Sequence, residues 1–200
     1  MKMNRYGVLT SFVVAVTLTG IAKGSVLLPI GGGPVVLPGS TAAAEPDLAG
    51  TVMRDNLIPF RVSNAAGSLL FVGELQNRVV RSSRGSVLHF YYSIRNTQAG
   101  LNGIISNVYT RSFAPTPTVA VDWRPDGLGQ VNPLRATRSI GTGDLIRFNF
   151  PSTISALSGG RESKFFFIKT NVLNYALNGQ TRIQLTSGES IVLNTAAPIP

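Results

Sequence analysis

The chain has 200 residues, 44% of them hydrophobic and 14% charged, with a net charge of +9 at pH 7. This length is enough for one domain that buries a hydrophobic core. Because the sequence contains no cysteine and one histidine, disulfide bonds are excluded and a zinc site would lack its usual ligands.

The first 22 residues have the pattern of a secretory signal peptide. Lys2 and Arg5 form a positive beginning, an uncharged apolar run follows, and Gly20-Ile21-Ala22 places small residues at a cleavage site. The apolar run is shorter than the roughly 20 residues that span a bilayer. We therefore predict a cleaved signal peptide over residues 1–22, with a retained anchor or a later cleavage point as alternatives. The chain is expected to be secreted to the extracellular space, the cell surface or the periplasm, with no transmembrane segment in the mature protein.

Residues 23–48 hold five glycines and four prolines. That density interrupts helices and central strands, so we expect a flexible linker behind the signal peptide. The three consecutive glycines at 31–33 do not form a phosphate-binding loop, because the Lys-Ser or Lys-Thr pair of that motif is absent.

From residue 49 onward, short runs of β-branched and aromatic residues alternate with turn residues. Asn178-Gly179 and Ser187-Gly188 are typical of hairpins, since glycine reaches positive φ without strain. The best helix candidate, residues 153–158, is one or two turns long. The expected strands are 69–75, 77–82, 87–96, 105–113, 118–123, 136–141, 144–150, 163–171, 181–186 and 190–194. This spacing predicts an all-β fold, a single antiparallel β-sandwich domain over residues 49–200 of immunoglobulin-like or jelly-roll-like type.

Alternation along the expected strands separates core residues from solvent-facing residues. In residues 163–171 both faces are apolar, which indicates a central strand covered on both sides, whereas residues 144–150 alternate. In residues 87–96 the predicted core face is Leu88, Phe90, Tyr92 and Ile94, and the predicted solvent face is His89, Tyr91, Ser93 and Arg95.

The side chains of common catalytic sites are mostly missing. A Ser-His-Asp triad would need His89, but neither a Gly-x-Ser-x-Gly elbow nor a Ser-x-x-Lys motif is present. Asp122 and Asp126 suggest a calcium loop, although the remaining ligands of an EF-hand are absent and a tight Pro-Asp-Gly turn explains the stretch. We therefore predict no enzyme activity, no catalytic residue, no cofactor and no metal site.

Exposed aromatic residues are the candidates for ligand contact, because sugars stack on aromatic rings. Trp123 lies at a strand end beside the turn 125–129, where loops of a sandwich often bind ligands. The alternative is that Trp123 plugs the core beneath that turn. The aromatic candidates are Tyr91, Tyr109, Trp123 and Tyr175, and the predicted ligand-contacting set is Tyr91, Arg95, Trp123 and Arg124.

The order of several stretches resembles the ectodomains of bacterial exported proteins that carry a PEP-CTERM sorting signal. The likeness covers roughly residues 66–193 and consists of LHFYYSIRN, VDWRPDGLG, RSIGTGDLIRFNFP and LSGGRESKFFFIKTNVLNYALNG. The resemblance implies an exported β-domain associated with the cell surface or matrix, and none of its motifs is catalytic. The sequence departs from the pattern at residues 196–200, where no Pro-Glu-Pro motif, apolar helix or basic tail occurs, so cleavage-linked sorting does not carry over.

These observations favour an exported, non-enzymatic β-sandwich protein with a role in surface or extracellular-matrix interactions. The alternative is a polysaccharide-binding module that uses exposed aromatic residues near Trp123. The basic residues are scattered singly instead of forming the clustered stripe of nucleic-acid-binding proteins. We therefore expect an anionic polysaccharide or matrix polymer as the partner, and no nucleic acid.

Overall fold

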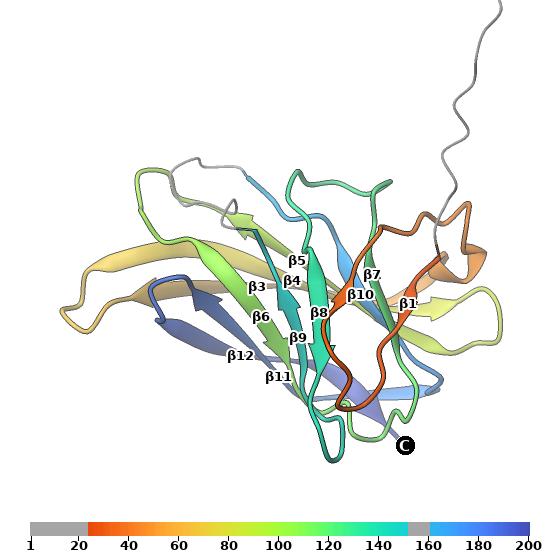
Figure 1. Cartoon of the computed structure of the whole chain (residues 1–200). Coiled ribbons are helices and arrows are strands. Elements are labelled where there is room, and N and C mark those ends of the chain that lie inside the picture. Colours follow the sequence, from red (N-terminus) through yellow and green to blue (C-terminus); the bar gives the residue numbers. More distant parts are fainter. Residues whose placement is uncertain (1–23, 152–160) are drawn as a thin grey trace, which may run out of the picture.

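The computed structural model describes residues 24–151 and 161–200, which form two six-stranded antiparallel sheets packed face to face (Figure 1). The predicted β-sandwich is confirmed. The predicted signal peptide and the short helix candidate at 153–158 lie outside the described residues. Within the described part of the chain, no helix is long and apolar enough to cross a membrane.

We name the two layers sheet A and sheet B. The strands of sheet A, in spatial order, are β1 (Val26–Leu27), β7 (Ala120–Trp123), β10 (Phe166–Lys169), β5 (Leu88–Asn96), β4 (Leu69–Ser82) and β3 (Gly50–Ser63). Those of sheet B are β12 (Ser190–Ile199), β11 (Asn174–Leu185), β6 (Ile105–Thr110), β9 (Ile146–Asn149), β8 (Arg135–Arg138) and β2 (Val35–Val36).

Strand β3 was not expected from the sequence. It runs for 14 residues along the edge of sheet A, and within residues 24–151 and 161–200 its one partner in the sheet is β4. Pro59 lies within it. A proline has no backbone N–H, so it cannot donate the hydrogen bond that a residue of a central strand gives to a neighbouring strand. An edge strand tolerates that loss, because one of its sides has no neighbour in the sheet.

The prediction of a flexible linker is wrong for residues 24–48. Strand β1 pairs with β7 at one edge of sheet A, and β2 pairs with β8 at an edge of sheet B, so this segment passes from one sheet to the other. Leu28 and Leu37 are buried in the core between the sheets. The glycines and prolines are tolerated because the two strands are edge strands of two residues each, and Gly31 turns with a φ of +67°.

The core lies between the inner faces of the two sheets, and the predicted core face of β5 is confirmed. Leu88, Phe90, Tyr92 and Ile94 have no exposed surface. Phe166 of β10 meets Phe148 of β9 across the sandwich, with ring centroids 4.8 Å apart. Ile146 and Phe148 are likewise buried, as the alternation of residues 144–150 predicts, and β10 is a buried strand inside sheet A.

The predicted solvent face of β5 is wrong for three of its four residues. His89, Tyr91 and Ser93 are buried, and only Arg95 is exposed. A second apolar cluster on the outer face of sheet A joins Tyr91 to Phe167, Val80 and Leu48, where Leu48 ends the short 3-10 helix η1 (Pro46–Leu48). The N-terminal segment therefore covers part of a face that the alternation of the strand assigned to water.

His89 is 1% exposed beneath this cover. Its Nε2 atom is 3.7 Å from a carboxylate oxygen of Asp47, and Lys169 approaches the same Asp47 oxygen to 2.7 Å. Glu45 also pairs with Lys169, at 3.4 Å. Burial lowers the pKa of His89, because the charged ring loses its hydration, and the positive Lys169 acts in the same direction.

We predict that Phe90→Ala lowers the free energy of unfolding by about 3–5 kcal/mol, the usual cost of emptying a buried aromatic site. Phe90 is fully buried and meets the edge of Phe113, with ring centroids 5.5 Å apart. Denaturant unfolding measures the loss. A loss within about 0.5 kcal/mol, as at exposed positions, would contradict the buried placement.

We also predict that His89 makes the folded state less stable as the pH falls below about 6.5, its ordinary pKa. Because the pKa of His89 is lowered in the folded chain, the unfolded chain binds the proton first as the pH drops. The wild-type protein should therefore lose more free energy of unfolding than His89→Gln between about pH 7.5 and 5.5. Denaturant unfolding at the two pH values tests this, and equal losses would contradict it.

Candidate functional site

A pocket of about 610 Å³ opens on the outer face of sheet A. Its walls come from β3, β4 and β5, from the end of η1 and the residue after it, from the turn after β7, and from two residues that precede β10. Three of the predicted ligand-contacting residues, Tyr91, Arg95 and Arg124, line it. The structure thus brings together residues from distant parts of the sequence, and Trp123 is not one of them.

The floor of the pocket is apolar and aromatic. Tyr91 packs against Phe165 with ring centroids 6.4 Å apart and against Phe167 at 5.4 Å. Its hydroxyl donates a hydrogen bond to the backbone oxygen of Leu48, at 2.9 Å. Burial raises the pKa of Tyr91, so the phenol stays protonated and keeps this bond. Tyr91 therefore fixes the end of η1 over the sheet, and the half-buried Phe165 is the more exposed of these aromatic rings.

Charged pairs surround this floor. Arg124 donates two hydrogen bonds to Asp126, at 2.7 and 3.0 Å, and a nitrogen of Arg95 lies 3.6 Å from Glu162. The hydrogen bond from Arg124 lowers the pKa of Asp126 and keeps it ionised. The side chain of Arg95 is 45% exposed, so its guanidinium is accessible from the pocket mouth.

A third arginine lies over the aromatic floor itself. The guanidinium carbon of Arg78 is 4.8 Å from the centre of the Phe165 ring, and a nitrogen of Arg78 is 2.6 Å from Asp55. Arg78 lies opposite Tyr91 in the register of β4 and β5, which explains why both point to the same face. The pocket thus offers donors and ionised acceptors around an aromatic ring.

The turn after β7 attaches the N-terminal segment to this face. The carboxylate of Asp122 is completely buried and accepts hydrogen bonds from the N–H of Gly39 and the hydroxyl of Ser40, both at 2.8 Å. Burial raises the pKa of Asp122. Asp126 accepts a further bond from the N–H of Ala42, at 3.0 Å. These bonds position the segment that leads into η1.

The predicted Pro-Asp-Gly turn is present, closed by a 3.3 Å bond from the Gly127 N–H to the Arg124 oxygen. The two aspartates of the suggested calcium loop do not share a site, since Asp122 binds residues 39 and 40 whereas Asp126 binds Arg124. Within residues 24–151 and 161–200, no group of three or more histidine, aspartate or glutamate side chains could hold a metal ion.

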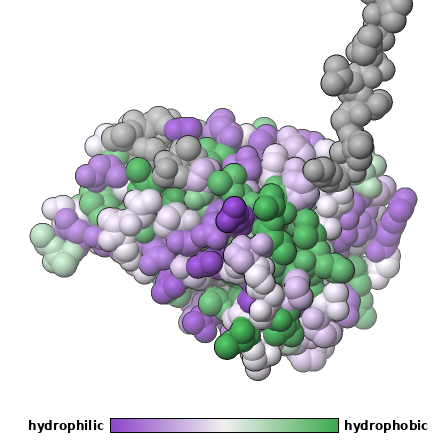
Figure 2. All heavy atoms as spheres, viewed as in Figure 1, coloured by the Kyte–Doolittle hydropathy of each residue, from purple (hydrophilic) through white to green (hydrophobic). Residues whose placement is uncertain are grey.

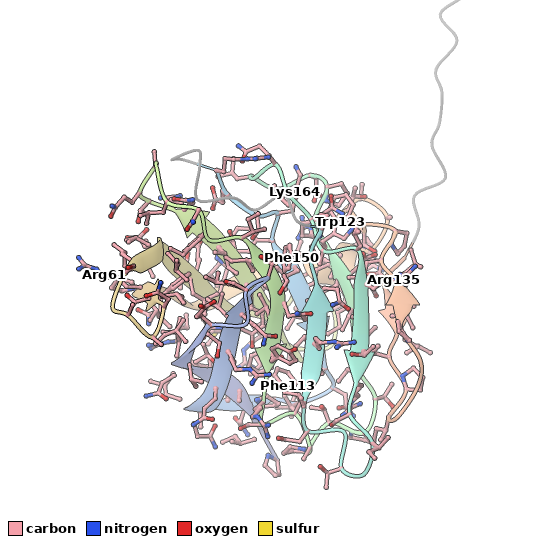
Figure 3. All side chains as sticks on the ribbon, turned by 60° about the vertical axis from the view of Figure 1, so that its left-hand side comes forward. Arg61, Phe113, Trp123, Arg135, Phe150 and Lys164 are labelled. Carbon is pink, nitrogen blue, oxygen red and sulfur yellow. The ribbon has the colours of Figure 1, made fainter. Side chains whose placement is uncertain are left out.

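Trp123 lies on the opposite face of β7 from the pocket. It is in register with the buried Phe166, and its indole N–H donates to the backbone oxygen of Leu37 at 3.2 Å. Its ring covers Gly39, where a Cβ atom would approach the ring to 2.8 Å. Trp123 therefore closes the edge of the core, which agrees with the alternative prediction that it plugs the core beneath the turn. Figure 3 shows Trp123 at the end of its strand.

Sequence reasoning missed Phe165, Arg78 and Gln76, which all line the pocket. Arg78 and Gln76 alternate with buried residues along β4, so their common face was predictable once β4 was recognised as one strand. The other aromatic candidates lie in sheet B, with Tyr109 on its outer face and Tyr175 against the core.

Comparison with known proteins found no family model, no curated protein and no solved structure that matches the chain.

We predict that ligands of the pocket leave the fluorescence of Trp123 unchanged. Trp123 is the single tryptophan of the chain and lies on the opposite face of β7 from the pocket, packed against the core. Its emission should be blue-shifted relative to a solvated indole and insensitive to soluble glycans. An emission shift that saturates with glycan concentration would instead place the ligand at Trp123.

Proposed function

We propose that the chain is an exported, non-catalytic β-sandwich protein that acts in cell-surface or extracellular-matrix interactions and binds a polysaccharide in the pocket on sheet A. The signal-like first 22 residues and the resemblance to exported PEP-CTERM ectodomains support export. The observation that carries the binding proposal is the aromatic floor of Phe165 ringed by arginine–carboxylate pairs.

A sugar ring has the surface chemistry that this pocket complements. Its C–H face packs on an aromatic ring, and its hydroxyls both donate and accept hydrogen bonds. Arg95 and Arg124 supply donors, whereas Glu162 and Asp126 supply acceptors. The pocket volume is within the range of small-molecule sites, which combine apolar walls with a few polar groups.

One carboxylate of the pocket, Asp126, is better suited to binding than to acid catalysis. Glycoside hydrolysis requires one carboxylic acid with a raised pKa to protonate the leaving oxygen. The pKa of Asp126 is lowered by Arg124, which suits a hydrogen-bond acceptor better than an acid. The excess of basic over acidic residues in the chain, 18 against 9, further supports a polysaccharide with acidic groups as the partner.

We predict that Arg95→Ala and Phe165→Ala each weaken glycan binding by about tenfold or more, since each removes a direct contact to the sugar. A glycan array identifies the ligand, and titration calorimetry measures the affinities. Arg61→Ala is the matched control, because it removes an exposed arginine of β3 that does not line the pocket. Glycan binding that survives both pocket variants would contradict the proposal.

The proposed absence of catalysis is tested separately from binding. The bound polysaccharide should remain intact after prolonged incubation with the purified protein, as measured by the release of reducing ends. Hydrolysis that is abolished by Glu162→Gln would show an enzyme and overturn this part of the proposal.

A further inference from the structure

The outer face of sheet B is a second polar surface, on the opposite side of the sandwich from the pocket. The strands of sheet B contain no aspartate and no glutamate, although they carry four arginines. One of them, Arg138, is buried. Figure 2 shows hydrophilic residues grouped over the middle strands of this face, next to a hydrophobic area over the β1–β2 segment.

Two rows of side chains cross this face, because the antiparallel register aligns them over five neighbouring strands. Strands lie about 4.8 Å apart, so each row is about 19 Å long. The first row, in spatial order from β8 to β12, is Thr137, Arg147, Tyr109, Arg182 and Val192. The second row is Arg135, Asn149, Asn107, Gln184 and Ser190.

Tyr109 is the centre of the first row and has an arginine on each side. The guanidinium carbon of Arg182 lies 4.2 Å from the centre of the Tyr109 ring, which holds this long side chain against the sheet. Arg147 is opposite Tyr109 on the other side. Among the described residues, neither Arg147 nor Arg182 forms an ion pair, so their positive charge is not neutralised on this face.

The three middle residues of the second row are amides that are connected by hydrogen bonds. The side-chain amide of Asn149 donates to Asn107, the amide of Asn107 donates to Gln184 at 3.4 Å, and the hydroxyl of Tyr109 donates to Gln184 at 3.0 Å. These bonds hold the side chains in place before any ligand arrives. Amides donate and accept, so the remaining positions suit hydroxyl groups.

We propose that the outer face of sheet B binds a linear polysaccharide that carries carboxylate groups, laid across the five strands. Arginine presents paired donors that match the geometry of a carboxylate. Arg135, Arg147 and Arg182 contact the acidic groups, and the amide row contacts the hydroxyls. Two rows of side chains that each run for about 19 Å fit an extended chain better than a compact ligand. This proposal does not depend on the pocket of sheet A.

Polygalacturonate, a linear polyuronate, is the probe. The double variant Arg147→Gln/Arg182→Gln should weaken its binding by about tenfold or more in biolayer interferometry at low salt, because two charge-assisted contacts are lost. The control Arg54→Gln/Arg61→Gln removes the same charge from β3 of sheet A and should change the affinity less than about twofold. Figure 3 shows Arg61 far from Arg135 of sheet B. Equal losses in both variants would mean that net charge alone attracts the polymer, and would overturn the proposal.

Salt and a second polyanion complete the test. Binding should weaken steeply as the salt rises past about 0.15 M, where the screening length is about 8 Å, and less steeply in the double variant. An affinity for polygalacturonate that barely changes with salt would overturn the proposal. So would a DNA duplex that binds as tightly as polygalacturonate and is weakened equally by the double variant. If polygalacturonate binding is instead lost in Arg95→Ala and Phe165→Ala but kept in the double variant, its affinity belongs to the pocket and this inference fails while the proposed function stands.

Discussion

The buried carboxylate of Asp122 is the interaction on which the outer face of sheet A depends. By binding Gly39 and Ser40 it holds a segment that sequence alone describes as a linker, and that segment carries η1 across the sheet. Leu48 then covers Tyr91, and Asp47 approaches His89. A buried carboxylate is costly unless its oxygens are hydrogen-bonded, so these partners are a condition of the fold.

Among the described residues, the outer face of sheet A is partly covered by other segments and that of sheet B is not, and this distinguishes the two faces. On sheet A, the N-terminal segment and the turn after β7 form the walls of a pocket. Paired charges surround the aromatic floor of this pocket. On sheet B no such cover lies over Tyr109 and its neighbours within the described residues, and Arg147 and Arg182 form no ion pair there. A pocket suits one sugar unit, whereas rows of polar and charged side chains across five strands suit the length of a polymer.

The inward-facing residues of a strand could be predicted wherever apolar and polar residues alternate along it, because the apolar side then packs in the core between the two sheets. Phe90 and Phe148 lie in this core, and the period of two along their strands was sufficient to place them. Phe166 also lies there, but β10 is apolar on both faces, so alternation alone could not say whether Phe166 or Phe167 faces the other sheet. Strand β3 escaped detection because Pro59 argues against a strand until one knows that the strand lies at an edge. Three of the predicted contact residues line one pocket, whereas Trp123 is in register with Phe166, packs against the core and does not line this pocket.

The sequence by itself determined the β-sandwich class, the inner faces of the strands and the scarcity of catalytic side chains, since these follow from local periodicity and composition. Only the tertiary structure decided the burial of His89 and Tyr91, the role of residues 24–48 and the composition of the pocket. The physical reason is that an outer sheet face is exposed or buried according to which distant segment lies on it. Asp122 and Gly39 are 83 positions apart, and no local pattern in the sequence reports the hydrogen bond between them.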